Sequence, residues 1–244
     1  MEVEILFMFC FVILTANIIQ GITGFAGTLI AMPFLILIVD LETSRQVLNL
    51  LGILASLWII RKDNSFISWK QVYKIWKLMS VGLVVGLFSY NFIPQNILLL
   101  LLSLFVLFIG VKGVVMSLFP VSKEKKITSN VSQFILLVSA GIIHGIFVSG
   151  GPLLVAYMTN NVQSKREFRA TLSTVWVGLN TIILIQSFLV GTITKSMTGY
   201  MLLATIPLFI GILLGDALLK RMSQKVFMLL AYGLLIFSGI SLWL

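Results

Sequence analysis

Residues 97 to 119, ILLLLLSLFVLFIGVKGVVMSLF, contain one charged side chain, Lys112, and form a run long enough to cross a bilayer as a helix. Similar runs recur along the chain, whose 244 residues are 59% hydrophobic and 10% charged, with a mean hydropathy of +1.10. A soluble domain is about 45–50% apolar and about 25% charged. Because the runs lack the alternation of barrel strands, we expect an all-α polytopic membrane protein.

The net charge of +9 comes from lysines and arginines clustered in short hydrophilic segments. In membrane proteins such clusters mark the cytoplasmic side, so we expect the lipid bilayer as partner and no nucleic acid. The single cysteine, Cys10, offers neither a disulfide nor a cysteine metal site, and we predict no cofactor and no metal. The acidic start, Glu2 and Glu4, does not resemble a cleavable signal peptide. We therefore expect a multi-pass protein of the cell membrane, specifically a prokaryotic inner membrane, and leave a homo-oligomer open.

The sequence contains a duplicated pattern of rare residues. With an offset of 124 the matching pairs are Gly21 and Gly145, Gly27 and Gly151, and Arg45 and Arg169; with an offset of 129 they are Gly82 and Gly211, Gly86 and Gly215, and Gln95 and Gln224. Transporters are often built from such repeats. We predict a first transmembrane repeat over 1–119, a cytoplasmic linker over 120–130 and a second repeat over 131–244.

Each half reads as five apolar segments, which gives 8–10 transmembrane segments in total. The expected segments are 5–20, 25–39, 45–61, 77–92 and 97–119, then 133–147, 149–159, 168–190, 198–219 and 225–243. The first two segments of each half are short, and a glycine-rich stretch separates them. We call Gly21–Gly27 the first break and Ser149–Pro152 the second break. Glycine and proline favour the end of one helix and the start of another there.

Equivalent loops of the two halves carry opposite charge bias. The 61–77 loop contains four lysines, whereas its counterpart near 191–196 contains only Lys195; the 216–225 loop is basic, and its counterpart at 91–96 is uncharged. This bias predicts inverted repeats, with both termini on the outer face. Cysteines introduced into 91–96 and into 216–225 are therefore expected to react with an impermeant reagent from opposite sides of the membrane. Labelling of both loops from one side would contradict the inversion.

The two breaks and the run Arg169-Ala170-Thr171-Leu172-Ser173 resemble the sulfite exporter TauE/SafE family over essentially the whole chain. The most specific pieces are Gly24-Phe25-Ala26-Gly27 with Pro33, and Ser149-Gly150-Gly151-Pro152. The resemblance implies a permease for sulfite, sulfonates or related small organic anions, with about eight transmembrane segments. The first break lacks the family's run of three glycines, and Tyr157 stands where the first half has Pro33.

The breaks are the first candidate anion site. A helix N-terminus presents unpaired N–H groups and about half a positive charge, which together favour an anion. The alternative is that these glycines only allow helices to pack closely. The predicted substrate-binding residues are Thr23, Gly24, Phe25, Ala26, Gly27 and Thr28 at the first break, and Ser149, Gly150 and Gly151 at the second.

A polar stripe in the third segment of each half is the second candidate. Arg169, Ser173, Trp176 and Asn180 share one helical face, and Arg45 and Asn49 are equivalent to the first two. We predict that these six residues bind substrate, with the arginines as pseudo-symmetric cations near the anion's path. The alternatives are a hydrogen-bonded seam between helices, and arginines that cap carbonyl groups at the end of their own half's short helix pair.

His144, the single histidine, lies in an apolar segment just before the second break. Its ordinary pKa of about 6.5 suits a proton carrier, so we predict a role in proton coupling. The alternative is a neutral histidine that bonds to a neighbouring helix.

The function predicted from these features is secondary transport of a small anion such as sulfite or an organosulfonate. An anion channel, or a membrane-embedded subunit of a larger complex, would share the same sequence features. We predict no enzyme: Ser149 and His144 lie on one stretch, and metalloprotease and paired-aspartate motifs are absent from the sequence.

Overall fold

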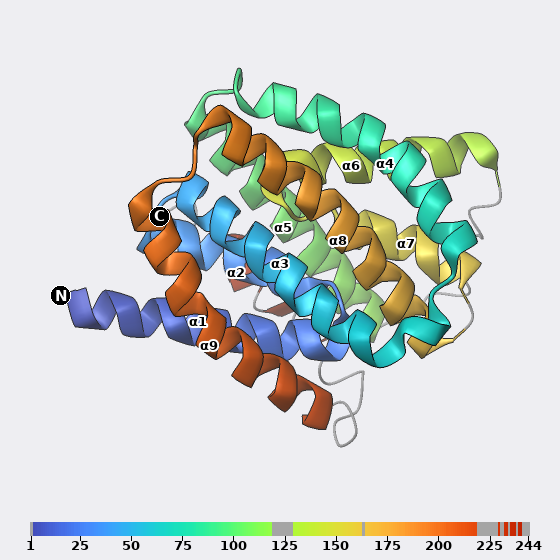
Figure 1. Ribbon diagram of the computed structural model, residues 1–244. Coiled ribbons are helices and arrows are strands. Elements are labelled where there is room, and N and C mark those ends of the chain that lie inside the picture. Colours follow the sequence, from blue (N-terminus) through green and yellow to red (C-terminus); the bar gives the residue numbers. More distant parts are fainter. Residues whose placement is uncertain are drawn as a thin grey trace.

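The computed structural model describes residues 2–118, 129–162, 164–218 and, near the C-terminus, 229, 232–233, 235–237 and 239–240. Within these residues the regular structure is helical throughout, as predicted (Figure 1). The helices are α1 (Glu2–Thr23), α2 (Ala26–Ile38), α3 (Leu41–Asp63), η1 (Asn64–Phe66), α4 (Trp69–Tyr90), α5 (Gln95–Leu118), α6 (Asn130–Phe147), α7 (Gly151–Asn161), α8 (Lys165–Val190) and α9 (Lys195–Leu218). Residues described between 229 and 240 are helical as well.

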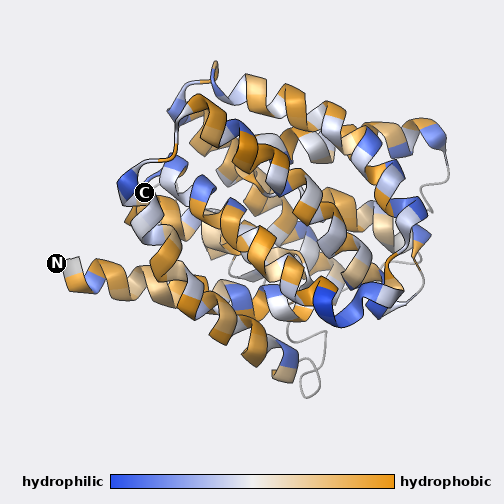
Figure 2. Cartoon of the chain, in the orientation of Figure 1, coloured by the Kyte–Doolittle hydropathy of each residue, from blue (hydrophilic) through white to orange (hydrophobic). Residues whose placement is uncertain are grey.

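Seven helices in the described ranges are long and apolar enough to cross a membrane: α1, α3, α4, α5, α6, α8 and α9. The short partners α2 and α7 each follow one of these helices at a break. Figure 2 shows the apolar residues along the helices and many of the hydrophilic ones towards the helix ends. The chain is a multi-pass membrane protein, which confirms the predicted class. The predicted linker falls mainly on residues outside the described ranges.

The predicted loop over 61–77 is wrong. α4 begins at Trp69, so Lys70, Lys74 and Lys77 lie on a helix. The carbonyl group of Ser68 starts that helix by accepting hydrogen bonds from the N–H groups of Gln71 and Val72, at 2.9 and 3.0 Å. A lysine can lay its methylene stem along an apolar helix while its ammonium group stays in water, so a basic stretch does not require a loop.

Helices α3 and α8 form the centre of the bundle, with α1 and α9 on one side and α4 and α6 on the other (Figure 1). α3 and α8 run antiparallel, because Gln46 contacts Ser187 and Asn49 contacts the carbonyl group of Asn180. α1 runs parallel to α9, since Phe9 packs on Tyr200 near their starts and Gly21 meets Gly215 near their ends.

α4 and α6 are parallel as well. Lys74 donates to Gln133 near their starts, at 2.7 Å, and Gly86 meets Gly145 near their ends. Glycines make both close pairs possible. A methyl group at Gly82 would collide with the carbonyl oxygen of Val138, and one at Gly211 would lie 2.7 Å from that of Leu14. The two contacts correspond under the sequence offsets, and in both the glycine lets two helices approach closely.

The prediction that the first segment of each half is short is wrong, because α1 and α6 are long enough to span, and only α2 and α7 are short. Each pair of a long and a short helix leaves the bundle at the end where it enters. The pair α1 and α2 starts beside the first turns of α9 and returns to the start of α3. The pair α6 and α7 starts beside Lys74 and returns to the first turn of α4, where Tyr157 donates to Gln71 at 2.8 Å. The two pairs therefore approach from opposite ends, as inverted repeats require. The duplication itself stays a prediction.

Candidate functional site

The two breaks share one backbone geometry. Gly24 and Val148, which correspond under the offset of 124, both have positive φ, 81° and 53°. Each N–H group closes the preceding helix, Gly24 on the carbonyl group of Gln20 at 2.7 Å and Val148 on that of His144 at 2.8 Å. A left-handed conformation is ordinary for glycine but strained for valine, and such strain concentrates at functional sites.

The first break satisfies its own N–H groups. The hydroxyl of Thr23 accepts from the N–H groups of Phe25 and Ala26, at 3.3 and 3.1 Å. Gln20 accepts from the N–H group of Gly27 at 3.0 Å and donates to the carbonyl group of Gly24 at 3.3 Å. The start of α2 is therefore capped internally and has little left to offer an anion in this conformation.

The second break is different. Gly150, the N-cap of α7, has no side chain that could accept from the first turn, and among the described residues no other side chain does so; Pro152 in this turn has no N–H group. Ser149, the nearest hydroxyl, instead donates to the carbonyl group of Phe147 at 2.9 Å. Of the two helix starts that the sequence predicts as anion sites, only that of α7 keeps uncapped N–H groups.

A small cavity joins the two breaks to the centre of the bundle. Its lining residues are Gln20, Phe25, Thr28, Gly52, His144, Val148, Ser149, Gly151, Trp176 and Asn180. A second small cavity shares Gln20, Thr28 and Gly52 with it. Each has a volume of about 10 Å³, room for about one water molecule. The predicted residues Phe25, Thr28, Ser149, Gly151, Trp176 and Asn180 thus line one closed cavity together with His144.

His144 sits in a polar cluster on one wall of this cavity. Its ring stacks on Trp176, with centroids 4.8 Å apart, and its Nε2 lies 2.8 Å from Oδ1 of Asn180. Asn49 donates to the carbonyl group of Asn180 at 3.0 Å. Nδ1 of His144 and Oδ1 of Asn49 are buried without a hydrogen-bond partner. A buried polar atom left unpaired costs about 1–3 kcal/mol, and the adjacent cavity has room for about one water molecule, so these atoms can bind water or a polar ligand there.

The polar stripe of α8 leads from this cluster towards one end of the bundle. Ser173 is buried, with its hydroxyl oxygen unpartnered, and Arg169 follows one turn closer to the end. We call this the basic end, since α3 finishes there with Arg61 and Lys62 and α8 starts there with Lys165 and Arg166.

Arg169 lies between the cavity and the basic end. Its side chain passes Gly24, where an added methyl group would lie 3.4 Å from its Cγ. Its Nη2 donates to Asp216 at 2.6 Å, while Lys62 binds the other carboxylate oxygen of Asp216 at 2.9 Å. Nε of Arg169 is buried and unpartnered. The Nε–H group of Arg169 therefore remains free to donate, and Asp216 is bound by Lys62 as well as by Arg169.

Arg45 is placed near the second break. It donates from Nη2 to the carbonyl group of Gly145 at 2.7 Å and from Nε to that of Ile146 at 3.1 Å. Its third nitrogen lies 3.8 Å from Glu42, and its guanidinium stacks on Tyr90 at 4.4 Å. Arg45 thus caps the end of α6. The predicted alternative placed such a cap within the arginine's own half, and here the capped helix belongs to the other half.

Sequence reasoning missed several residues of this region. Gln20 and Gly52, which are not among the predicted site residues, line the cavity, and the offset of 124 relates them to His144 and Trp176. Val148 gave no signal, because a valine does not suggest a left-handed backbone. Asp216 gave none either, since nothing local links it to Arg169.

Gly52 offers a direct test of the cavity. A methyl group there would lie 2.5 Å from Nδ2 of Asn180, the mobile end of a side chain that can shift. Gly52→Ala is therefore expected to insert and fold normally but to fill the cavity and lower transport at least about tenfold, the effect of about 1.4 kcal/mol. Gly191→Ala does not serve as the control, because Gly191 has a φ of 73°. Gly199→Ala does, since no described atom lies within 4 Å of that position.

The sequence model of the family described as Sulfite exporter TauE/SafE matches residues 9–242. The chain belongs to the TauE/SafE family. It is also 24% identical over 177 residues, 72% of each chain, to a protein of Comamonas testosteroni named "Probable inner membrane transporter protein TsaS". No solved structure matches it.

Family membership confirms the resemblance that the two glycine breaks indicated and identifies the chain as a membrane transporter. The cavity between α7, α3 and α8 is the place in the described residues where helix breaks, unpaired polar atoms and an uncapped helix start meet.

Proposed function

We propose that this TauE/SafE protein is a secondary transporter of a small anion, such as sulfite or an organosulfonate, in the cell membrane. The observation that carries the proposal is the uncapped start of α7 beside a buried polar cavity. Its N–H groups, together with about half a positive charge at the helix start, would bind one end of the anion. The stripe of α8 supplies the route, with Arg169 as the cation of the stripe.

A cavity of about 10 Å³ is too small for a sulfonate, so binding requires one end of the bundle to open. Polar contacts close both ends. At the basic end Asp216 of α9 holds Arg169 of α8 and Lys62 of α3. At the other end, Gln46 of α3 donates to Glu42 and to Ser187 of α8, at 2.6 and 2.8 Å. We assign these clusters as the two gates of alternating access.

The experiment that tests the function is uptake by the purified chain in proteoliposomes. Sulfite, sulfoacetate, thiosulfate and small carboxylates are the substrates to compare. Saturation of uptake and exchange of labelled for unlabelled anion are expected of a carrier. Flux that does not saturate would favour the channel, and no flux from the purified chain alone would favour a subunit of a larger complex.

His144 has the geometry of a proton acceptor next to this anion site. If its Nε2 donates to Oδ1 of Asn180, a neutral ring leaves the unpartnered Nδ1 free to accept a proton. Protonation would turn Nδ1 into a donor for the anion, and anion and proton would then bind together. For one coupled proton the driving force changes by about 1.4 kcal/mol per unit of pH gradient.

We therefore predict that His144→Gln keeps measurable anion uptake but removes its dependence on a pH gradient. Glutamine is the residue of the first half at this position, Gln20, so it is a suitable replacement. The measurement is initial uptake at several internal and external pH values. An unchanged pH profile in the variant would assign His144 to packing alone.

A further inference from the structure

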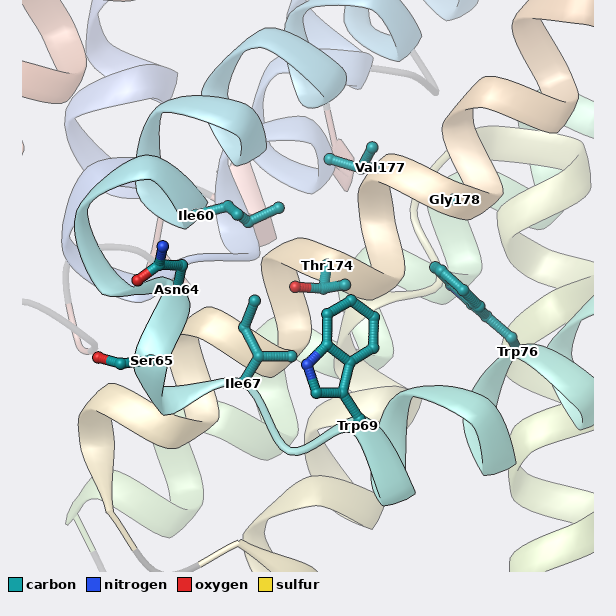
Figure 3. Close-up of a pocket in the computed structure, with 9 residues that line it drawn as sticks. All are labelled: Ile60, Asn64, Ser65, Ile67, Trp69, Trp76, Thr174, Val177 and Gly178. Atoms are coloured by element: carbon teal, nitrogen blue, oxygen red, sulfur yellow. The ribbon is translucent and has the colours of Figure 1, made fainter.

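A large groove lies at the basic end, separate from the anion site. It has a volume of about 540 Å³ and lies between the end of α3, η1, the first turns of α4 and the middle of α8 (Figure 3). Its lining residues are Ile60, Asn64, Ser65, Ile67, Trp69, Trp76, Thr174, Val177 and Gly178. It shares no residue with the central cavity. The groove is therefore a feature distinct from the anion site.

The walls of the groove are fixed by hydrogen bonds. Trp76 donates from its indole nitrogen to the carbonyl group of Val175 at 3.2 Å, and its ring fills the space above Gly178. The N–H group of Ser68 donates to the hydroxyl of Thr171 at 2.9 Å. These bonds hold the first turns of α4 against α8, so the shape of the groove is determined by the contacts between these helices.

The lining is graded from polar to apolar. Figure 3 shows Asn64 and Ser65 at one side of the groove and Trp76 with Gly178 at the other, with Trp69 standing between them. Trp69 is 50% exposed. Tryptophan at this position is typical of the membrane–water interface, where its ring lies at the level of lipid headgroups.

Two bases stand next to groove residues in the sequence. Arg61 follows Ile60 and Lys70 follows Trp69, both are exposed, and neither forms an ion pair within the described residues. The nearby Asp63 has its charge matched by Arg166, at 4.0 Å. Two positive charges without an ion pair in the described residues thus neighbour lining residues in the sequence, which fits a negative headgroup at the groove with an acyl chain along its apolar residues.

We propose that this groove binds one anionic phospholipid of the cytoplasmic leaflet. Arg61, Lys70, Asn64 and Ser65 contact the phosphate group, and an acyl chain lies along Ile60, Ile67, Trp69 and Val177. Because the groove joins α3, α4 and α8, the lipid fastens the basic-end gate region to the membrane surface.

The test is the melting temperature of the purified protein in uncharged detergent, with phosphatidylglycerol or phosphatidylcholine of the same acyl chains added. The wild type is expected to gain about 3 °C or more from phosphatidylglycerol over phosphatidylcholine. The double variant Arg61→Gln/Lys70→Gln is expected to lose this preference. Val177→Phe, which fills the groove, is expected to lose the stabilisation by phosphatidylglycerol while still folding.

Lys195→Gln is the control, because Lys195 is an exposed base at the start of α9, neither it nor its sequence neighbours line the groove, and its loss should change nothing. Equal stabilisation by both lipids in the wild type, or an unchanged preference in the double variant, would overturn the proposal. So would an equal loss in Lys195→Gln, which would indicate general surface charge. A matching rise with glycerol 3-phosphate alone would assign a phosphate site and reject the lipid. No step of this test depends on transport, so it is independent of the proposed substrate.

Discussion

Arg169→Gln is expected to lower anion transport about 10- to 150-fold while the protein still inserts and folds. A hydrogen bond to a charged group contributes about 1.5–3 kcal/mol, and the variant removes the only cation of the α8 stripe that leads to the cavity. The fold should survive, because Lys62 remains bound to Asp216 at 2.9 Å and no carboxylate is left unpaired. The measurement is the concentration dependence of uptake in proteoliposomes, with folding checked by size-exclusion chromatography.

The variant Asp216→Asn distinguishes a role of Arg169 in anion binding from a role in holding α8 to α9. It frees the Nη2 of Arg169 that Asp216 now occupies, so the anion is expected to bind at least as tightly as in the wild type. Arg169→Lys keeps the charge but loses the fork of donors and is expected to be intermediate. Equal damage by Asp216→Asn and Arg169→Gln would mean that the ion pair only holds α8 to α9. Near-normal anion affinity in Arg169→Lys would leave the start of α7 as the site.

Gly82→Ala and Gly211→Ala are expected to destabilise the folded protein by about 1–3 kcal/mol each, the usual cost of overpacking. The methyl group would meet backbone atoms of the neighbouring helix, Val138 on α6 or Leu14 on α1, and backbone cannot move aside as a side chain can. The two variants should behave alike, because the two contacts correspond under the sequence offsets. The measurement is thermal unfolding in detergent, followed by loss of the monodisperse peak.

Gly199→Ala is the matched control on α9. No described atom lies within 4 Å of a methyl group at this position, and alanine is the better helix former by about 1 kcal/mol. The control is therefore expected to be as stable as the wild type or more so. Wild-type stability in both Gly82→Ala and Gly211→Ala would show that the α1–α9 and α4–α6 contacts are looser than the structure places them.

Local sequence patterns were enough to predict the membrane class and the positions of most helices of this protein. A run such as 97–119 can satisfy its backbone in lipid only as a helix, so composition alone indicated the class and the positions of most spans. The glycine breaks and the spacing of Arg169, Ser173, Trp176 and Asn180 along one helix were also readable, because helical periodicity is a property of neighbouring residues. The sequence did not predict the first turns of α4, because a cluster of lysines at a membrane surface is compatible with a helix as well as with a loop.

The tertiary structure decided which polar groups are used and which remain free. Arg45 reaches carbonyl groups about a hundred residues away, at Gly145 and Ile146, and Arg169 finds its counter-ion on α9. No sequence signal separates these two equivalent arginines, yet one is consumed in capping and the other keeps a free nitrogen. Likewise the sequence predicted unpaired N–H groups at the starts of both α2 and α7. In the folded protein Gln20 accepts from the N–H group of Gly27 and so caps the start of α2. Hydrophobic pattern fixes where helices form, whereas partners for buried polar atoms exist only after the helices meet.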